Sequence, residues 1–344
     1  MSENQKKYDV VGLGSCTMDC IFKVDDVMRM DLIDRDKNEK KYIGIEHSSK
    51  LNVNEVKFYP GGSAANIAVD LSNIGMKTAY IGGIGTDSSG DSALKDLKTH
   101  GVDVSGIKRF EEEVTATSVI LITPWGRDRS ILAYKGANNL FGPKHINEEM
   151  LKSTKCFAWT SLTSDNGIAA IRKCIELARA SGALIAGAPS ISIIKKRPED
   201  AKQILKQCDV TSMNDEEIEA LTGTKDAISG MRTLFDWGLQ IVNVTFGKEG
   251  QWISDGKILV RTKPPKVFPA DTTGAGDATM SGIIYGKLQG KSLAESARIA
   301  SSLSAMEIEA PGVRVGTPQE WKQLNNFMQR HTIEQETVGL DGQK

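Results

Sequence analysis

Asp271-Thr272-Thr273-Gly274-Ala275-Gly276-Asp277 places a carboxylate behind a run of small residues, directly before residues 278–288, whose composition suits a helix. The first turn of a helix leaves its backbone N–H groups unpaired, and the positive end of the helix dipole attracts anions. Residues 274–276 carry no bulk that would keep an anion away from those groups. Asp277 could then accept a proton from an attacking hydroxyl group. The same residues also fit a plain loop in which the aspartate only favours the dipole.

A second glycine-containing pattern lies nearer the N-terminus, at Gly61-Gly62-Ser63-Ala64-Ala65-Asn66-Ile67-Ala68. Two adjacent glycines let the backbone approach a ligand closely, and the Asn66 amide can donate to and accept from hydroxyl groups. Asp19 follows the first expected strand, and a carboxylate accepts from two vicinal hydroxyl groups at once. The alternatives are a tight turn before a small-residue helix and a turn-forming aspartate.

Two further polar segments follow expected strands in the second half of the chain. Asn214-Asp215-Glu216-Glu217, taken alone, is typical of the acidic first turn of a helix. Thr245-Phe246-Gly247-Lys248-Glu249-Gly250 is typical of a hairpin turn before a strand at 251–254. Because ligands of open α/β sheets gather at the carboxyl ends of strands, Asn214 and Thr245 stand at positions where a ligand would bind.

Taken together, these segments resemble the pfkB family, which includes ribokinase, fructokinase and adenosine kinase. Residues 271–277 are similar to the DTxGAGD signature, and residues 61–68 to the N-terminal GGxxxN pattern. Residues 214–217 resemble the N-x-x-E motif, and residues 245–250 the T-x-G…G loop. At average residue frequencies, the first string would arise by chance with a probability on the order of 10⁻⁵. The resemblance extends from about residue 8 to about residue 327 and implies a ribokinase-like α/β fold.

The resemblance also implies a role for each motif. Asp277 would be the general base, and the N–H groups of the turn would hold the transferring phosphoryl group at Gly274, Ala275 and Gly276. The acceptor would be bound by Asp19, Gly61, Gly62 and Asn66, and the nucleotide by Asn214, Thr245, Gly247 and Gly250. Glu217 would hold Mg²⁺ through water. Asp271 would contribute to a site for a monovalent cation such as K⁺, although plain helix capping explains it equally well.

The implied activity is ATP-dependent, Mg²⁺-dependent phosphorylation of a primary hydroxyl group on a sugar. A nucleoside kinase of the adenosine-kinase-like type is the alternative, favoured by Gly187-Ala188-Pro189-Ser190, whereas Lys135-Gly136-Ala137-Asn138 favours the sugar kinases. A non-catalytic sugar or nucleotide sensor on the same fold would usually lack the base, so Asp277 counts against it. A dinucleotide-dependent oxidoreductase would need G-x-G-x-x-G, but residues 12–17 end in threonine.

Alternating strand and helix patterns in the middle of the chain predict a central, mostly parallel sheet with helices on both faces. One helix is expected near residues 168–180, where apolar residues recur at helical spacing, and a buried strand follows at 183–186. A hairpin is expected at 117–135, around a turn at 124–128, and a charged flap at 25–57. We therefore expect one kinase domain over residues 8–330, with β-lid segments at about 18–60 and 107–136, and a mobile tail at 331–344.

Composition sets the remaining expectations. With 40% hydrophobic and 25% charged residues, the 344-residue chain is typical of soluble globular proteins. Its net charge of −1 offers no basic field for nucleic acid or anionic membranes. Five cysteines without a C-x-x-C pair and a polar N-terminal segment predict a cytoplasmic protein that does not bind membranes. The exposed strand edges of the lid favour a homodimer through the lid.

Overall fold

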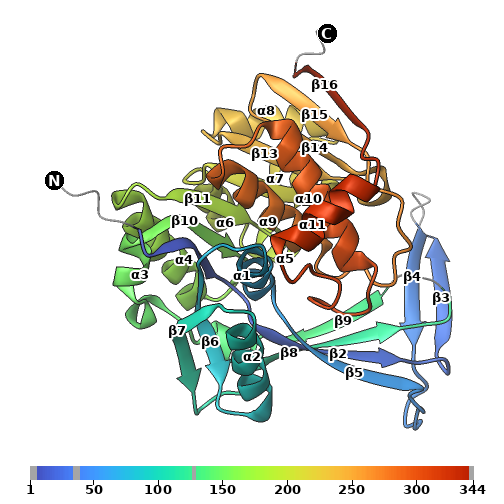
Figure 1. Cartoon of the computed structure of the whole chain (residues 1–344). Coiled ribbons are helices and arrows are strands. Elements are labelled where there is room, and N and C mark those ends of the chain that lie inside the picture. The colour runs from blue at the N-terminus through green and yellow to red at the C-terminus, as the bar shows by residue number, and fades with distance from the viewer. Residues whose placement is uncertain (1–5, 34–38, 126–128, 341–344) are drawn as a thin grey trace.

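The computed structural model describes residues 6–33, 39–125 and 129–340. Within this part of the chain, ten strands form a central sheet, four form a second sheet and two form a hairpin. Helices cover both faces of the central sheet, and the two smaller sheets project from one side of the molecule (Figure 1). The prediction of a mostly parallel, helix-covered sheet with a small β-lid is confirmed.

Seven neighbouring strands of the central sheet are parallel, in the order β7-β6-β1-β10-β11-β12-β13. Their bounds are Asp103–Phe110 (β7), Thr78–Gly85 (β6), Tyr8–Leu13 (β1), Thr154–Thr160 (β10), Leu184–Ala188 (β11), Val210–Asn214 (β12) and Ile241–Thr245 (β13). Three antiparallel strands extend the sheet beyond β13: Gln251–Ser254 (β14), Ile258–Thr262 (β15) and Gln335–Gly339 (β16). The carboxyl ends of the seven parallel strands therefore share one edge.

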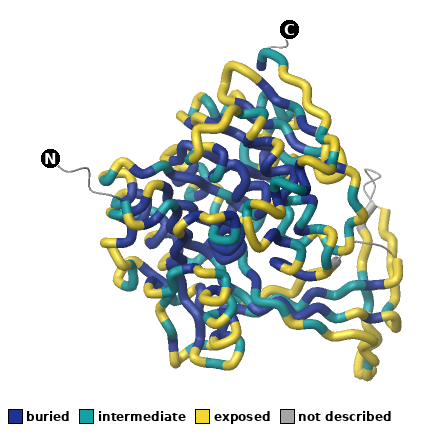
Figure 2. The backbone as a smooth tube through the Cα atoms, viewed as in Figure 1, coloured by how far each residue is buried: buried dark blue, intermediate teal, exposed yellow. Residues whose placement is uncertain are grey.

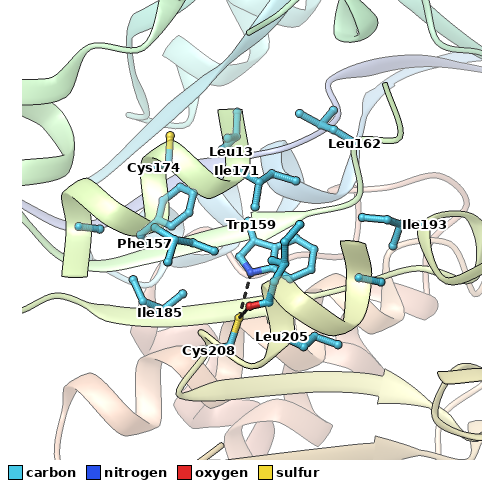
Figure 3. Close-up of a cluster of buried hydrophobic side chains, with 14 of the residues drawn as sticks. Leu13, Phe157, Trp159, Leu162, Ile171, Cys174, Ile185, Ile193, Leu205 and Cys208 are labelled. Atoms are coloured by element: carbon cyan, nitrogen blue, oxygen red, sulfur yellow. Dashed lines mark hydrogen bonds between the residues drawn. The ribbon is translucent and has the colours of Figure 1, made fainter. Parts of the chain in front are cut away.

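Both faces of the sheet are buried, because successive side chains of a strand point to opposite faces. In β10, Phe157 and Trp159 join one hydrophobic core, whereas Cys156 and Ala158 join the other. Figure 3 shows Trp159 enclosed by aliphatic and aromatic side chains, with its indole Nε1 donating to Cys208 Sγ at 3.2 Å. This pairing satisfies the polar atom of a fully buried indole.

The helices divide between these cores. The core that contains Trp159 is covered by Glu148–Lys152 (α3), Asp165–Ala180 (α4), Ile191–Lys196 (α5), Pro198–Leu205 (α6), Asp215–Thr222 (α7) and Ala227–Asp236 (α8). The opposite core is covered by Ser63–Asn73 (α1), Ala275–Leu288 (α9), Leu293–Ile308 (α10) and Trp321–Arg330 (α11). A smaller cluster packs Ser88–Thr99 (α2) against α1 and β6. The expected helix near 168–180 is α4, which begins three residues earlier because Ser164 caps it through Gly167 N.

The lid is a four-stranded sheet in the order β5-β2-β8-β9, beside a separate hairpin of β3 and β4. Its strands are Thr17–Lys23 (β2), Glu55–Gly61 (β5), Ala116–Ile122 (β8) and Arg129–Tyr134 (β9), and the hairpin strands are Met28–Ile33 (β3) and Glu39–Gly44 (β4). Figure 2 shows that the lid carries most of its exposed residues on its far end and on the hairpin. The expected lid thus combines segments that lie about 100 positions apart in the sequence.

One expected boundary of the lid was wrong. Residues 107–110 belong to β7 of the central sheet, so the second lid segment begins at Ala116 instead of about 107. Asn138 lies in a buried 3-10 turn, Gly136–Asn139 (η1), where its side chain bonds both the backbone N–H and the backbone C=O of Cys16. The expected turn residues 126–128 and the flap residues 34–38 lie outside the described residues.

The prediction of a mobile tail at 331–344 was wrong for residues 335–340. Residues 335–339 form β16, which pairs along the whole of β15, and the next residue, Leu340, is buried. Gln335 also donates to the Ala294 carbonyl and to Thr262 Oγ1. The strand covers an edge of the sheet that would otherwise present unpaired backbone groups; residues 341–344 lie outside the described residues.

None of the described helices is long and apolar enough to span a bilayer.

Candidate active site

Helix α9 begins inside the glycine-rich stretch, as predicted. Its N-cap is Gly274, whose φ of 84° is left-handed, and a Cβ atom there would lie 2.7 Å from Glu307 Oε1. Only glycine adopts this backbone angle without strain and also leaves that space. Helix α9 therefore begins directly after this glycine, and Asp277 lies in its first turn, where backbone N–H groups have no intrahelical partner.

Asp277 contacts Asn66, the asparagine of the predicted acceptor-binding motif at the start of α1. Asn66 Nδ2 donates to Asp277 Oδ2 at 2.7 Å, across 211 positions of sequence. Burial raises the pKa of Asp277, and hydrogen bonds from Asn66 and Ser63 together with the charge of Arg314 partly offset this rise, so that the pKa is about 6. Asp277 is therefore mostly ionised at pH 7, the state in which a carboxylate can accept a proton.

The predicted acceptor residues lie together beside this carboxylate. Asp19 on β2 is buried, and a Cβ atom at Gly61 would collide with Asp19 Oδ2, so the carboxylate lies directly against the glycine backbone. Thr17 Oγ1 donates to Asp19 Oδ1 at 3.2 Å. Burial raises the pKa of Asp19, and Asp19 in turn raises that of Asp277, so the two carboxylates interact electrostatically. Gly62, with a φ of 101°, turns the chain from β5 into α1.

A cavity of about 690 Å³ opens on the other side of the α9 N-terminus. Three of the four predicted nucleotide residues line it, namely Thr245, Gly247 and Gly250. Ala275 and Gly276 line it as well, and a Cβ atom at Gly276 would meet open space. The cavity volume falls within the usual range for small-ligand pockets, roughly 300–1,000 Å³.

Two parts of this cavity were not expected from the sequence. They are a proline-containing loop and one face of α10, with lining residues Lys263, Pro264, Pro265, Lys266, Val267, Pro269, Ser301, Ser304, Ala305 and Ile308. The only available signal was the cluster of prolines just before the glycine-rich stretch, since α10 becomes a wall of the cavity only through tertiary packing.

Asn214 and Glu217 form a reciprocal cap at the start of α7 and do not line the cavity. Glu217 N donates to Asn214 Oδ1 at 2.8 Å, and Asn214 N donates to Glu217 Oε2 at 2.9 Å. Glu217 Oε1 accepts from Ile191 N at 3.0 Å, and burial raises the pKa of this carboxyl. Each carboxylate oxygen still has one lone pair for water. These contacts fit a carboxylate that orders water around Mg²⁺ rather than one that ligates the ion directly.

Asp271 ties the glycine-rich stretch to the loop that follows α10. Its Oδ1 accepts from Thr273 N at 2.9 Å and from Thr273 Oγ1 at 2.7 Å. Its Oδ2 accepts from Gly312 N at 3.2 Å. These bonds form a turn before the helix, because the N-cap of α9 is Gly274 and no side chain caps that helix. The capping explanation was therefore wrong, and a role of Asp271 near a monovalent cation stays a prediction.

Arg314 is a site residue that no motif indicated. It lies in the same loop as Gly312, is 6% exposed, and donates through Nε to Asn66 Oδ1 at 2.9 Å. The only sequence signal was a charged residue between two valines in Gly312-Val313-Arg314-Val315-Gly316.

The architecture is a ribokinase-like α/β fold, as two solved structures of similar fold show. An adenosine kinase from Sinorhizobium meliloti superposes with a TM-score of 0.77 at 24% identity, covering 91% of this chain and 98% of that one. A protein assigned as ribokinase II from E. coli, in complex with ATP and Mg²⁺, superposes with a TM-score of 0.79 at 21% identity, covering 94% of this chain and all of the other. The fold prediction is confirmed.

The chain belongs to the pfkB family of carbohydrate kinases, whose profile matches residues 18–320. An uncharacterized sugar kinase of Archaeoglobus fulgidus is 31% identical over 72% of this chain and 98% of its own length. Fructokinase-2 of Solanum lycopersicum is 31% identical over 65% of this chain and 71% of its own length. A nucleoside kinase of Methanothermobacter thermautotrophicus is 26% identical over 82% of this chain and 89% of its own length. Kinases of this family are ATP-dependent phosphotransferases, and their acceptors include both sugars and nucleosides.

Proposed function

We propose that this protein transfers the terminal phosphoryl group of ATP to a primary hydroxyl group of a sugar. The observation that carries the proposal is the position of Asp277, whose carboxylate is held by Asn66 between the acceptor residues and the helix N-terminus that borders the cavity. Such a geometry brings a proton acceptor, an acceptor hydroxyl and a phosphate-binding surface together.

In this proposal Asp19 and Asn66 orient the sugar through its hydroxyl groups. Asp277 accepts the proton of the attacking hydroxyl as its oxygen bonds to the γ-phosphorus of ATP, while the bond from that phosphorus to the bridging oxygen breaks and ADP leaves. The N–H groups of Gly274, Ala275 and Gly276 stabilise charge on the transferring group. Bound Mg²⁺ would neutralise nucleotide oxygens, with Glu217 ordering its water shell. Closure of the lid over the acceptor would exclude water and suppress hydrolysis of ATP.

On the donor side, Thr245, Gly247 and Gly250 contact the nucleotide in this proposal, with Asn214 nearer the phosphates. Asp271 takes part in a K⁺-dependent arrangement of the anion-binding turn. The cavity wall formed by the proline-containing loop offers apolar surface for a base, since ligand pockets combine apolar walls with a few polar groups.

A sugar is favoured over a nucleoside as the acceptor by the sugar kinase and fructokinase relatives, and the nucleoside kinase relative keeps the alternative in view. The test measures ADP release with ATP and Mg²⁺ and, one at a time, D-fructose, D-ribose, adenosine and inosine. Acceleration by a sugar supports the proposal, acceleration only by a nucleoside supports the alternative, and no acceleration by any acceptor would point to a sensor on the same fold. Thermal stabilisation by ATP with Mg²⁺, but not by NAD, would distinguish a sugar or nucleoside kinase from a dinucleotide-dependent oxidoreductase.

Replacing Gly276 by leucine should block the nucleotide without unfolding the protein. A side chain at this position enters open space in the cavity instead of meeting protein atoms. We expect the KM for ATP to rise at least about tenfold, a loss of about 1.4 kcal/mol of binding, while the melting temperature stays unchanged. Gly276→Ala is the graded control, with a much smaller effect. Normal ATP saturation in Gly276→Leu would place the nucleotide elsewhere.

We further propose that the outer face of the lid pairs with the lid of a second copy. Asp19 is in register with Tyr59, Ser118 and Ala133, so the neighbouring positions Phe58 and Leu132 point to the opposite face. These two side chains are 62% and 60% exposed. Val56 and Tyr134 extend the same apolar face, which is larger than scattered surface apolar residues would give.

Sedimentation of the protein tests this pairing. The unaltered chain should sediment as a dimer, and Phe58→Lys with Leu132→Lys should sediment as a monomer, because burial of unpaired charges at an interface is costly. Ile258→Lys, an exposed apolar position on β15 away from the lid, is the control and should stay dimeric. A monomeric unaltered chain would contradict the proposal.

The cysteines agree with a reducing compartment such as the cytoplasm, which we propose as the location. All five are free thiols and buried.

A further inference from the structure

Arg314 holds several parts of the acceptor side at once although it does not reach the cavity. Its guanidinium donates through Nε to Asn66 Oδ1 at 2.9 Å, through Nη2 to the Gly61 carbonyl at 3.2 Å, and through Nη1 to Asp96. The side chain is 4% exposed, so these contacts replace water almost completely. A buried guanidinium with its donors satisfied in a fixed planar geometry orients its partners strongly.

The backbone of Arg314 is fixed as firmly as its side chain. Its φ of 67° is unusual for a residue other than glycine, and its N–H donates to Glu307 Oε1 at 2.7 Å. Such a conformation persists only where surrounding contacts determine it. The guanidinium therefore enters the site from a rigid loop.

The contact with Asn66 decides how that amide is oriented. An asparagine side chain carries its carbonyl oxygen and its NH₂ group on opposite branches, and a flip exchanges them. Arg314 can only donate hydrogen bonds, so its contact with Asn66 requires the amide orientation in which Oδ1 faces the guanidinium. In that orientation Nδ2 points toward Asp277. Without Arg314, Asn66 would be free to rotate and Asp277 would lose a fixed donor.

The charge of Arg314 also acts on the carboxylates. Asp277 is faced by Asp19 on β2, Asp70 on α1, Glu217 on α7 and Glu307 on α10, and Arg314 is the cation that lowers its pKa. Arg314 lowers the pKa of Asp19 as well. Replacing the guanidinium by a neutral group should therefore raise the pKa of Asp277 above about 6.

We propose that Arg314 is a positioning residue for phosphoryl transfer. It orients Asn66 so that the amide holds the Asp277 carboxylate toward the acceptor, and through the Gly61 carbonyl it fixes the glycine backbone that lies against Asp19. This inference rests on the proposed base role of Asp277. It assigns the buried arginine to the reaction rather than to the stability of the fold alone.

The test compares Arg314→Lys, Arg314→Gln and the control Asp96→Asn with the unaltered protein, using ATP, Mg²⁺ and the member of the acceptor panel with the highest rate. We expect kcat to fall about 10²-fold in both Arg314 variants, the size expected when a reacting group is misplaced by about 1 Å. The acidic limb of the pH–rate profile should move to higher pH in Arg314→Gln and stay in place in Arg314→Lys, which keeps the charge. Asp96→Asn removes only the outer partner and should leave kcat within about threefold, even if the melting temperature falls.

A double-mutant cycle with Asn66→Ala distinguishes an effect of Arg314 that acts through Asn66 from a purely structural role of Arg314. If Arg314 acts through Asn66, then Arg314→Lys should cost little further rate once Asn66 is alanine. An equal loss in both backgrounds, or an Arg314→Lys protein with unaltered kcat, would overturn the inference. If Arg314→Gln does not fold, the cycle with Arg314→Lys gives the same answer. Failure of the proposed function looks different, because Asp277→Asn would then keep its activity whatever the Arg314 variants do.

Discussion

Asp277→Asn should lower kcat by about 10²–10⁴-fold, the range expected for the loss of a general base. Asparagine keeps the shape of the side chain and can still contact Asn66, but it cannot take a proton from the attacking hydroxyl group. In the unaltered protein, the rate should fall as pH drops through about 6, because protonation of Asp277 then removes the same base. Steady-state kinetics between pH 5 and 8 measure both effects.

The control for Asp277→Asn is Asp215→Asn. Asp215 also lies in the first turn of a helix that follows a parallel strand, but it is exposed and makes only the dipole contribution. The control should keep its activity within about twofold, since an exposed dipole contact contributes well under 1 kcal/mol. A decrease of less than about tenfold in Asp277→Asn would show that Asp277 is not the base.

Asp19→Asn should lower kcat/KM for the sugar by about 10²–10⁴-fold while the KM for ATP stays nearly constant. Hydrogen bonds to a charged group contribute roughly 1.5–3 kcal/mol each, and a carboxylate can accept from two sugar hydroxyl groups. Asp19 is buried against Gly61, so water replaces neither contact easily. Initial rates at varied sugar and fixed ATP, and the reverse, separate the two substrates.

Asp31→Asn is the matched control for Asp19→Asn. It alters a carboxylate of the β3 strand that is exposed and bonded to Arg29. It should leave both KM values unchanged, because exposed ion pairs contribute little. If Asp19→Asn lowered kcat/KM equally for ATP and for the sugar, Asp19 would support the fold of the lid instead of binding the acceptor.

Local chemistry explains why part of the site could be predicted from the sequence. A glycine at the N-cap and an aspartate in the first turn specify a helix N-terminus and its free N–H groups within seven adjacent residues, 271–277. Likewise, the apolar run at 183–186 and the helical spacing of α4 indicate a buried strand and a buried helix face before any tertiary contact is known. The βαβ order then restricts the sheet to a parallel arrangement.

Other features depended on residues that are distant in the sequence. Asn66 bonds Asp277 across 211 positions and Arg314 bonds Asn66 across 248 positions, and no local pattern encodes such pairs. For the same reason, the pairing of the C-terminal residues 335–339 with β15 was missed, since a short polar segment becomes a strand only where an open edge accepts it.

The sequence alone therefore determined the parallel sheet, the helix that presents the phosphate-binding turn, and the residues that stand at that turn. Tertiary structure decided which side chain orients which, where the lid begins, what walls the nucleotide cavity, and that a buried arginine belongs to the site. The physical reason is that backbone propensity and hydrophobic periodicity act over a few neighbouring residues, whereas side-chain orientation and burial are set by contacts between segments that only the folded chain brings together.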